Sequence, residues 1–202
     1  MLRMYEADWS PRNSHLRTRR GYLRPPLPLG AARALLSIAA SQGKNRPGHH
    51  QVMLLDVKKA FLYGNIQRRV YIELPQEDEK REGGQMMGLL NKAMYGLRDA
   101  PQVWQQEVRR ILKGMGFIES VTSPCVYVNP QTSVRIVTHV DDFLCVGPRS
   151  ALDEFYGELS KVLDLTCNIL GPSPGDGKVG QFLGRKIKWH NWGISWQGDN
   201  EV

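Results

Sequence analysis

Three aspartates stand where apolar segments end, and their chemistry needs an explanation. Asp56 closes the nearly continuous apolar run of residues 51–57, and Asp141 and Asp142 lie between two further apolar segments. Burying an unpaired carboxylate is unfavourable, and a bound cation removes that penalty. Because Mg²⁺ takes oxygen ligands and commonly uses one or two carboxylates, the three aspartates are candidate ligands of a magnesium site.

Each aspartate also has an ordinary structural interpretation. Asp141 and Asp142 are typical of a hairpin turn, because Asp tolerates turn geometry and bonds its own backbone. Asp56 could cap a following helical turn by accepting hydrogen bonds from the backbone N–H groups of Lys58 or Lys59. Taken alone, the pair favours a turn, whereas capping by Asp56 is compatible with metal binding.

Hydrophobic periodicity predicts the elements that must position these residues. Helical spacing indicates helices over residues 31–40, 100–115 and 150–163. The expected strands cover residues 51–57, 70–72, 86–90, 125–128, 134–140 and 143–146, with a terminal hairpin over residues 181–196. Asp141 and Asp142 then join two of these strands as a tight hairpin. The pattern predicts one α+β domain.

Composition indicates which partners and which cellular location this domain is expected to have. Residues 1–24 carry six arginines and two acidic residues, so +4 of the formal net charge of +7 lies there, and prolines follow. We expect residues 1–28 to be a basic, flexible arm suited to nucleic acid. The three cysteines lack metal-ligand spacing and read as core residues. No membrane span or secretory signal is recognisable, which favours an intracellular location, cytoplasm or nucleus, and no membrane partner.

Six separated segments occur in a characteristic order and spacing. They are residues 56–65, 70–75, 95–104, 124–128, 139–142 and 182–184. Together they resemble a copia-type LTR-retrotransposon reverse transcriptase, and the resemblance extends over residues 25–188. It implies an α+β reverse-transcriptase palm, an antiparallel sheet with helices on one face and a ferredoxin-like core. We therefore expect a truncated fingers and palm domain over residues 29–188 and a C-terminal remnant over residues 189–202.

The resemblance implies an RNA-directed DNA polymerase that extends a primer 3′ end on an RNA or DNA template with deoxynucleoside triphosphates. Asp56, Asp141 and Asp142 match the family's catalytic aspartates. Together with Val57 they would hold two metal ions, Mg²⁺ or Mn²⁺, in the usual two-metal arrangement.

Further residues match the family's nucleotide and primer segments. The nucleotide set is Lys58, Lys59, Ala60, Phe61, Tyr95, Gly96 and Arg98, and the primer set is His139, Phe182, Leu183 and Gly184. In the family the aromatic at Phe61 excludes a 2′-hydroxyl. Alternative structural roles stay open for these residues: Phe61 as a core side chain, the lysines as solvated surface residues, residues 95–97 as a turn before a helix, and residues 182–184 as a strand with a glycine bulge.

Three positions depart from the family pattern. His139 stands where the family usually has Tyr, Asp99 where Gln is common, and Asn168 where many members carry a Lys that could act as an acid. The basic fingers hairpin is not recognisable, and we expect the thumb to be truncated and the RNase H region to be absent. Two alternatives therefore stay open: an inactive retroelement fragment that keeps the fold and weak nucleic-acid binding, and an unrelated α+β domain whose aspartates cap turns.

Overall fold

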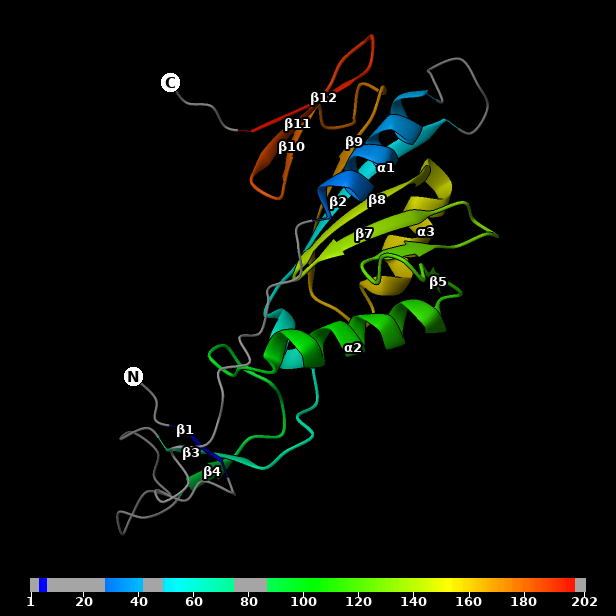
Figure 1. Cartoon of the computed structure of the whole chain (residues 1–202). Helices are drawn as coiled ribbons and strands as arrows, with labels where there is room; N and C mark the ends of the chain where they lie inside the picture. Colours follow the sequence, from blue (N-terminus) through cyan, green and yellow to red (C-terminus); the bar gives the residue numbers. More distant parts are fainter. Residues whose placement is uncertain (1–3, 7–27, 42–48, 75–86, 199–202) are drawn as a thin grey trace. The chain divides into compact units, whose positions relative to one another are not determined.

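The computed structural model describes residues 4–6, 28–41, 49–74 and 87–198, and it combines α-helices with antiparallel sheets (Figure 1). Contacts divide the chain into two compact units. The smaller unit comprises residues 1–24 and 61–107, and the larger unit comprises residues 25–60 and 108–202. Helix α2 (Ala100–Gly114) begins in the smaller unit and ends in the larger one.

The smaller unit contains a three-stranded antiparallel sheet. Its strands, in the order β1–β3–β4, are β1 (Met4–Glu6), β3 (Val70–Glu73) and β4 (Met87–Leu89). The short 3-10 helix η2 (Ala60–Tyr63) runs into this unit, and the core gathers around Val70, Ala93 and Leu97. Residues 4–6, which lie within the predicted arm, pair with β3. Apart from these and Pro28, the predicted arm lies outside the described residues.

The larger unit is built on a six-stranded antiparallel sheet in the order β5–β6–β7–β8–β2–β9. Its strands are β2 (His50–Val57), β5 (Ile118–Glu119), β6 (Val126–Val128), β7 (Arg135–His139), β8 (Asp142–Pro148) and β9 (Leu165–Leu170). Strand β2 lies between β8 and β9 and is buried along its length except at Asp56. An apolar run buried on both faces explains why residues 51–57 lack the alternation of a half-exposed strand.

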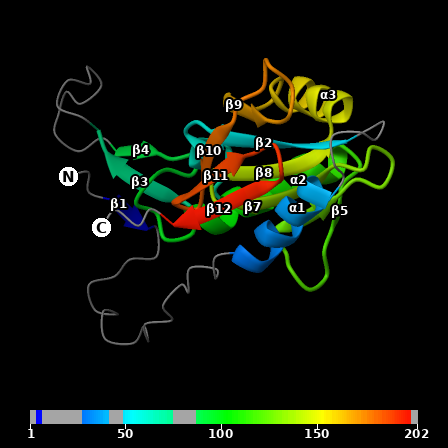
Figure 2. The same cartoon turned by 90° about the horizontal axis from the view of Figure 1, so that it is seen from above.

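Helices cover both faces of this sheet. Helix α1 (Leu29–Ser41) buries Leu35 and Leu36 in one cluster with Leu54 and Leu144. Helix α3 (Arg149–Leu159) contacts β8 and β2 but lies outside that cluster, and Figure 2 shows α1 and α3 on opposite sides of the strands. The expectation that the helices share one face was therefore wrong for α1. Successive side chains of a strand point to opposite faces, and the apolar residues of β2 and β8 are buried on both, so both faces need a packed element.

A second sheet packs over the α1 side. It consists of β10 (Val179–Phe182), β11 (Arg185–Trp189) and β12 (Ile194–Gly198), in that order. Phe182 and Ile187 are buried in the same cluster as α1. The predicted terminal hairpin is confirmed as β11 and β12, whereas β10 and its turn at Leu183 and Gly184 were missed.

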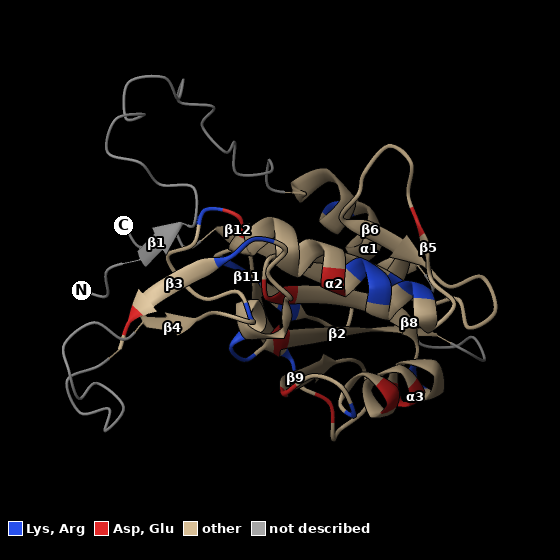
Figure 3. Ribbon diagram, turned by 90° about the horizontal axis from the view of Figure 1, so that it is seen from below, with Lys and Arg blue, Asp and Glu red and all other residues tan. Residues whose placement is uncertain are grey.

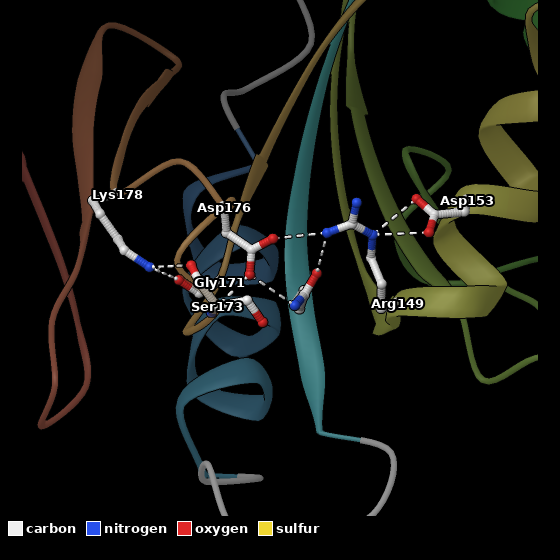
Figure 4. A network of polar contacts seen from close by, with 7 residues as sticks. Arg149, Asp153, Gly171, Ser173, Asp176 and Lys178 are labelled. Atoms are coloured by element: carbon white, nitrogen blue, oxygen red, sulfur yellow. Dashed lines mark hydrogen bonds and ion pairs between the residues drawn. The ribbon is translucent and has the colours of Figure 1, made fainter.

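A buried polar network fixes the loop between β9 and β10 (Figure 4). The Asp176 side chain is 3% exposed, and it accepts hydrogen bonds from Arg149 at 2.7 Å and from Gln51 at 3.0 Å. Lys178 donates to the carbonyl groups of Gly171 and Ser173. A Cβ at Gly171 would clash with Asp176 Oδ2 and lie 2.8 Å from Gln51 Nε2, so a larger residue here would have to displace the network. The network ties the loop to β2 and to the start of α3.

Candidate active site

One row of side chains crosses four strands at the end of the six-stranded sheet. Asp56 on β2 pairs directly with Asp142 on β8, and Asp142 pairs with His139 on β7. On the other side of β2, Asp56 pairs with Thr166 on β9. Directly opposed residues of antiparallel strands project to the same face, so the four side chains form one polar row.

The third aspartate, Asp141, lies at the tip of the β7–β8 hairpin, between His139 and Asp142 of this row. Val140 and Asp141 form the two-residue connection between β7 and β8. The backbone carbonyl of Asp141 accepts a hydrogen bond from the Val57 N–H at 2.9 Å. This bond ties the hairpin tip to the end of β2, so the fold brings Asp56, Asp141 and Asp142 to one place.

Val140 adopts a left-handed backbone conformation, with φ of 54°. A positive φ is rare for a β-branched residue, because its Cβ substituents crowd the backbone. Such residues persist only where the surrounding structure imposes them, and they cluster at functional sites. The strained residue lies directly before Asp141.

The surroundings of Asp142 disfavour the ionised form of its side chain. Burial, followed by the charges of Asp141 and Asp56, raises the pKa of Asp142 to about 6. Three carboxylates gathered at a sheet end therefore suit a hard cation, which would relieve this repulsion. The Val57 side chain is buried, so only its backbone could contribute.

A complete protein cage for a metal is not formed, however. Within the described ranges, no group of three or more His, Cys, Asp or Glu side chains converges as ready ligands. Mg²⁺ rarely requires such a cage, because it usually binds through one or two carboxylates together with substrate phosphates and water. The donors present fit Mg²⁺ by their chemistry, and Asp56 with Asp142 is the pair best placed to hold it.

The remaining nucleotide candidates of the larger unit follow Asp56. The Lys58 ammonium pairs with Asp164 at 3.2 Å, and the Lys58 N–H donates to the Asp164 carbonyl at 2.9 Å. Lys59 is exposed with φ of 53°, and Ala60 is buried. Lys58 is thus engaged by an exposed carboxylate, and Lys59 reaches solvent.

The smaller unit holds the other nucleotide candidates. The rings of Phe61 and Tyr95 lie 4.8 Å apart at an angle of 58°. Phe61 also packs against the core of this unit, whereas Tyr95 is 56% exposed. Gly96 has φ of 97°, which glycine adopts without strain, and Arg98 is exposed. The structure thus joins Phe61 and Tyr95 into one aromatic pair.

The primer candidates occupy two different environments. His139 lies in the polar row. Burial lowers the pKa of its imidazole, and the nearby negative charge of Asp141 offsets only part of this effect. Phe182 is 2% exposed in the core, so its ring is unavailable to a primer. Leu183 and Gly184, with φ of 55° and 67°, form a two-residue turn, in which Leu183 packs against the core and Gly184 is exposed.

Two of the departures from the family pattern have structural partners. Asp99 accepts two hydrogen bonds from Arg68, at 2.9 and 3.0 Å, and this interaction lowers the Asp99 pKa. The Asn168 amide donates to the Val179 carbonyl at 3.0 Å and so links β9 to β10. Asp99 and Asn168 therefore serve the fold of this chain.

Sequence reasoning missed Thr166. Its hydroxyl lies 3.5 Å from Asp56 Oδ2, at the limit of a hydrogen bond. No motif marks this residue, and residues 165–170 were not predicted as a strand. Only the pairing of β9 with β2 identifies it, and a register is not readable from one strand alone.

Charge is unevenly distributed over the larger unit. Figure 3 colours the ribbon by residue type and shows basic residues along the C-terminal half of α2, which contains Arg109, Arg110 and Lys113. Glu119 neutralises part of this charge through an ion pair with Arg109 at 2.7 Å. No helix among the described residues is long and apolar enough to cross a membrane.

Comparison with known proteins agrees with this arrangement. The chain matches the model of the reverse transcriptase (RNA-dependent DNA polymerase) family over residues 22–194, and it belongs to that family. The retrovirus-related Pol polyprotein from transposon TNT 1-94 of Nicotiana tabacum is 32% identical over 167 residues, which are 81% of this chain. The corresponding polyprotein from transposon RE1 of Arabidopsis thaliana is 35% identical over 95 residues, 46% of this chain. The resemblance to copia-type LTR-retrotransposon reverse transcriptases is confirmed.

The chain is short relative to these proteins. It spans 12% of the Nicotiana polyprotein and 6% of the Arabidopsis polyprotein. It also spans 42% of a putative transposon Ty5-1 protein of Saccharomyces cerevisiae, at 27% identity over 136 residues. The activities of the full polyproteins therefore belong to much longer chains and are not assigned to this chain by the similarity alone.

Proposed function

We propose that the chain carries the nucleotidyl-transfer centre of a reverse transcriptase, which extends a primer 3′ end on an RNA or DNA template. The observation that carries this proposal is the convergence of Asp56, Asp141 and Asp142 at one end of the sheet. The raised pKa of Asp142 supports the proposal, because strongly shifted carboxylates are common at functional sites.

The proposed architecture is a palm. Strand order β7–β8–β2–β9, with α2 following β2 and α3 following β8, is the order of a ferredoxin-like β-α-β-β-α-β core and supports this assignment. On this proposal the larger unit contains the palm, and the smaller unit contributes partial fingers. Residues 29–188 are then the fingers and palm domain.

The chain's own residues would act by position and charge. Asp56, Asp141 and Asp142, together with the Val57 backbone, would hold two divalent cations. When bound, such ions lower the pKa of the primer hydroxyl and stabilise charge on the transferred phosphate. Phe61 and Tyr95 would lie against the sugar and base of a deoxynucleoside triphosphate, with Gly96 allowing close approach and Arg98 meeting phosphate. The backbone at Leu183 and Gly184 would support the primer.

Primer extension tests the proposal. The full chain is incubated with a primed RNA template, deoxynucleotides and Mg²⁺, and product length is measured for the native chain, Asp141→Asn, Asp142→Asn and the control Glu154→Gln, which changes an exposed carboxylate on α3. Extension should be lost in both hairpin variants and retained in the control. Equal extension by the native chain and Asp141→Asn would refute the assignment.

The alternative function is nucleic-acid binding by an inactive retroelement-derived fragment. The engagement of Lys58 by Asp164 favours it, because an ammonium group already paired with a carboxylate is less available to a triphosphate. It predicts salt-sensitive binding of the primed template with no incorporation at saturating nucleotide. Incorporation that requires Asp142 would exclude it.

A further inference from the structure

A small pocket lies at the opposite end of β2 from Asp56. Its volume is about 80 Å³, and its walls come from the end of α1, the first residues of β2 and the β11–β12 connection. His49, His50, Trp189, His190 and Trp192 all line it. These residues belong to the larger unit and to none of the nucleotide or primer segments considered above.

Two of the histidines that line this pocket each have a buried nitrogen without a hydrogen-bond partner among the described residues. His50 is 6% exposed, and its Nδ1 finds no partner among the described residues. The Nε2 atom of His49 is likewise buried without a partner in that part of the chain. Buried polar atoms are almost always hydrogen-bonded, so the pair calls for a ligand that offers hydrogen-bonding groups.

An aromatic platform stands beside these nitrogens. The rings of His190 and Trp192 are stacked, 4.7 Å apart and 9° from parallel. His190 Nε2 is held by the Ser195 hydroxyl at 2.8 Å, which fixes the ring that supports Trp192. Trp192 nevertheless remains 79% exposed, so one large aromatic surface is available for stacking.

The charge around the pocket restricts the ligand further. None of the described lining residues is Lys, Arg, Asp or Glu, so the pocket favours a neutral, planar group over a phosphate or a cation. Next to the platform, however, Lys186 and Lys188 are exposed on the outer face of β11, and Lys188 pairs with Ser195. No residue of β10, β11 or β12 is acidic. A neutral ring carried on an anionic backbone fits both features.

We propose that this pocket binds an unpaired nucleobase of single-stranded nucleic acid, stacked on Trp192 and hydrogen-bonded to His49 and His50, with Lys186 and Lys188 meeting its phosphates. Unpaired bases are recognised in this way, by stacking on aromatic side chains and by hydrogen bonds to their edges. The ligand class rests on the proposed function, but the pocket lies away from the aspartates. It would hold a strand at the end of β11 remote from Leu183 and Gly184.

Anisotropy titrations of the full chain test this proposal. The probes are a labelled oligodeoxyadenylate and an abasic oligomer of the same length, and the variants are Trp192→Ala and, as control, Val121→Ala at a residue that is 98% exposed. Trp192→Ala should weaken oligodeoxyadenylate binding about tenfold and leave abasic binding unchanged. The control should affect neither. Equal affinity of the native chain for both probes would overturn the proposal, as would equal losses on both in Trp192→Ala.

A second variant tests the histidines. His50→Leu removes a buried polar group without a described partner, so the thermal midpoint should stay the same or rise while oligodeoxyadenylate affinity falls. Unchanged affinity would show that the histidine nitrogens are merely hydrated and would overturn their role. Lys186→Gln with Lys188→Gln should weaken both probes and flatten the salt dependence.

The two proposals can fail separately. Asp141→Asn should abolish primer extension but keep the preference for oligodeoxyadenylate over the abasic oligomer. A chain that extends primers without this preference would refute the pocket alone, and a chain with the preference but no extension would refute only the catalytic assignment.

Discussion

Asp56 and Asp142 are directly paired across β2 and β8, so two carboxylates face the same side at the end of the central sheet. The Asp142 side chain is partly buried, and Asp141 adds a third charge. The ionised form of Asp142 is therefore destabilised, and binding of a proton or a cation would remove this destabilisation. This relationship makes the site testable by stability as well as by activity.

Neutralising Asp142 should stabilise the metal-free chain at high pH. Its folded pKa of about 6 lies above the ordinary value of 3.8, so the folded state binds the proton more tightly. The corresponding stability is present at low pH and is lost as the pH rises through about 6. After discounting for partial exposure, Asp142→Asn should raise the free energy of unfolding by about 1–2 kcal/mol at pH 8 and by almost nothing at pH 4.

Urea titrations with a chelator measure this effect, and Glu154→Gln is the matched control because it removes an exposed carboxylate. Adding Mg²⁺ should stabilise the native chain at pH 8 more than Asp142→Asn. An Asp142→Asn variant that is less stable than the native chain at pH 8 would contradict the account.

Replacing Val140 should release backbone strain. Asn tolerates a left-handed conformation far better than a β-branched residue, so Val140→Asn should raise the free energy of unfolding by about 0.5–1 kcal/mol. The control is Val162→Asn, at a valine that is 49% exposed and has no positive φ. Equal urea midpoints for the two variants would show that Val140 is not strained. If the strained conformation of Val140 positions the Asp141 side chain for metal binding, the stabilised variant should extend primers more slowly.

The network at Asp176 should matter more for stability than the exposed ion pair beside it. Asp176→Asn leaves Arg149 without its buried carboxylate partner, and we expect the free energy of unfolding to fall by about 2–3 kcal/mol. Asp153→Asn removes a pair whose side chains are 47% and 51% exposed, so the loss should stay below about 1 kcal/mol. Urea denaturation compares the two variants. Similar losses would mean that burial of Asp176 does not strengthen its interactions.

Local patterns predicted the elements well but not their relations. The helix expected over residues 31–40 is α1 (Leu29–Ser41), because its apolar residues recur at helical spacing. The strand expected over residues 51–57 is β2 (His50–Val57), because a short, nearly continuous apolar run is typical of a strand buried on both faces. The hairpin at Asp141 and Asp142 also followed from turn chemistry. In the structure Asp142 begins β8, and the unexpected turn residue is Val140, whose left-handed conformation no propensity suggests.

Long-range polar contacts could not be predicted. Thr166 reaches Asp56 only because β9 pairs with β2, a choice among several possible neighbours. Asp176 lies in a loop rich in Gly and Pro that reads as solvated, yet its carboxylate is buried by Arg149 and Gln51. The buried nitrogens of His49 and His50, which have no partner among the described residues, likewise arise from tertiary burial, which a sequence does not display.

Replacing Asp99 with Gln, the residue that is common at this position in the family, should destabilise the folded chain. Arg68 donates two hydrogen bonds to Asp99, and the two side chains are 32% and 21% exposed. Because Arg68 lowers the pKa of Asp99, the stability from this pair is present above pH 4 and is lost as the pH falls through the lowered folded pKa. Asp99→Gln should therefore reduce the free energy of unfolding by about 1 kcal/mol at pH 7 and by less at about pH 2.5. A double-mutant cycle with Arg68→Gln isolates the pair, and its coupling energy should shrink on acidification. A coupling energy that is independent of pH would mean that shape, rather than charge, makes Asp99 suit this position.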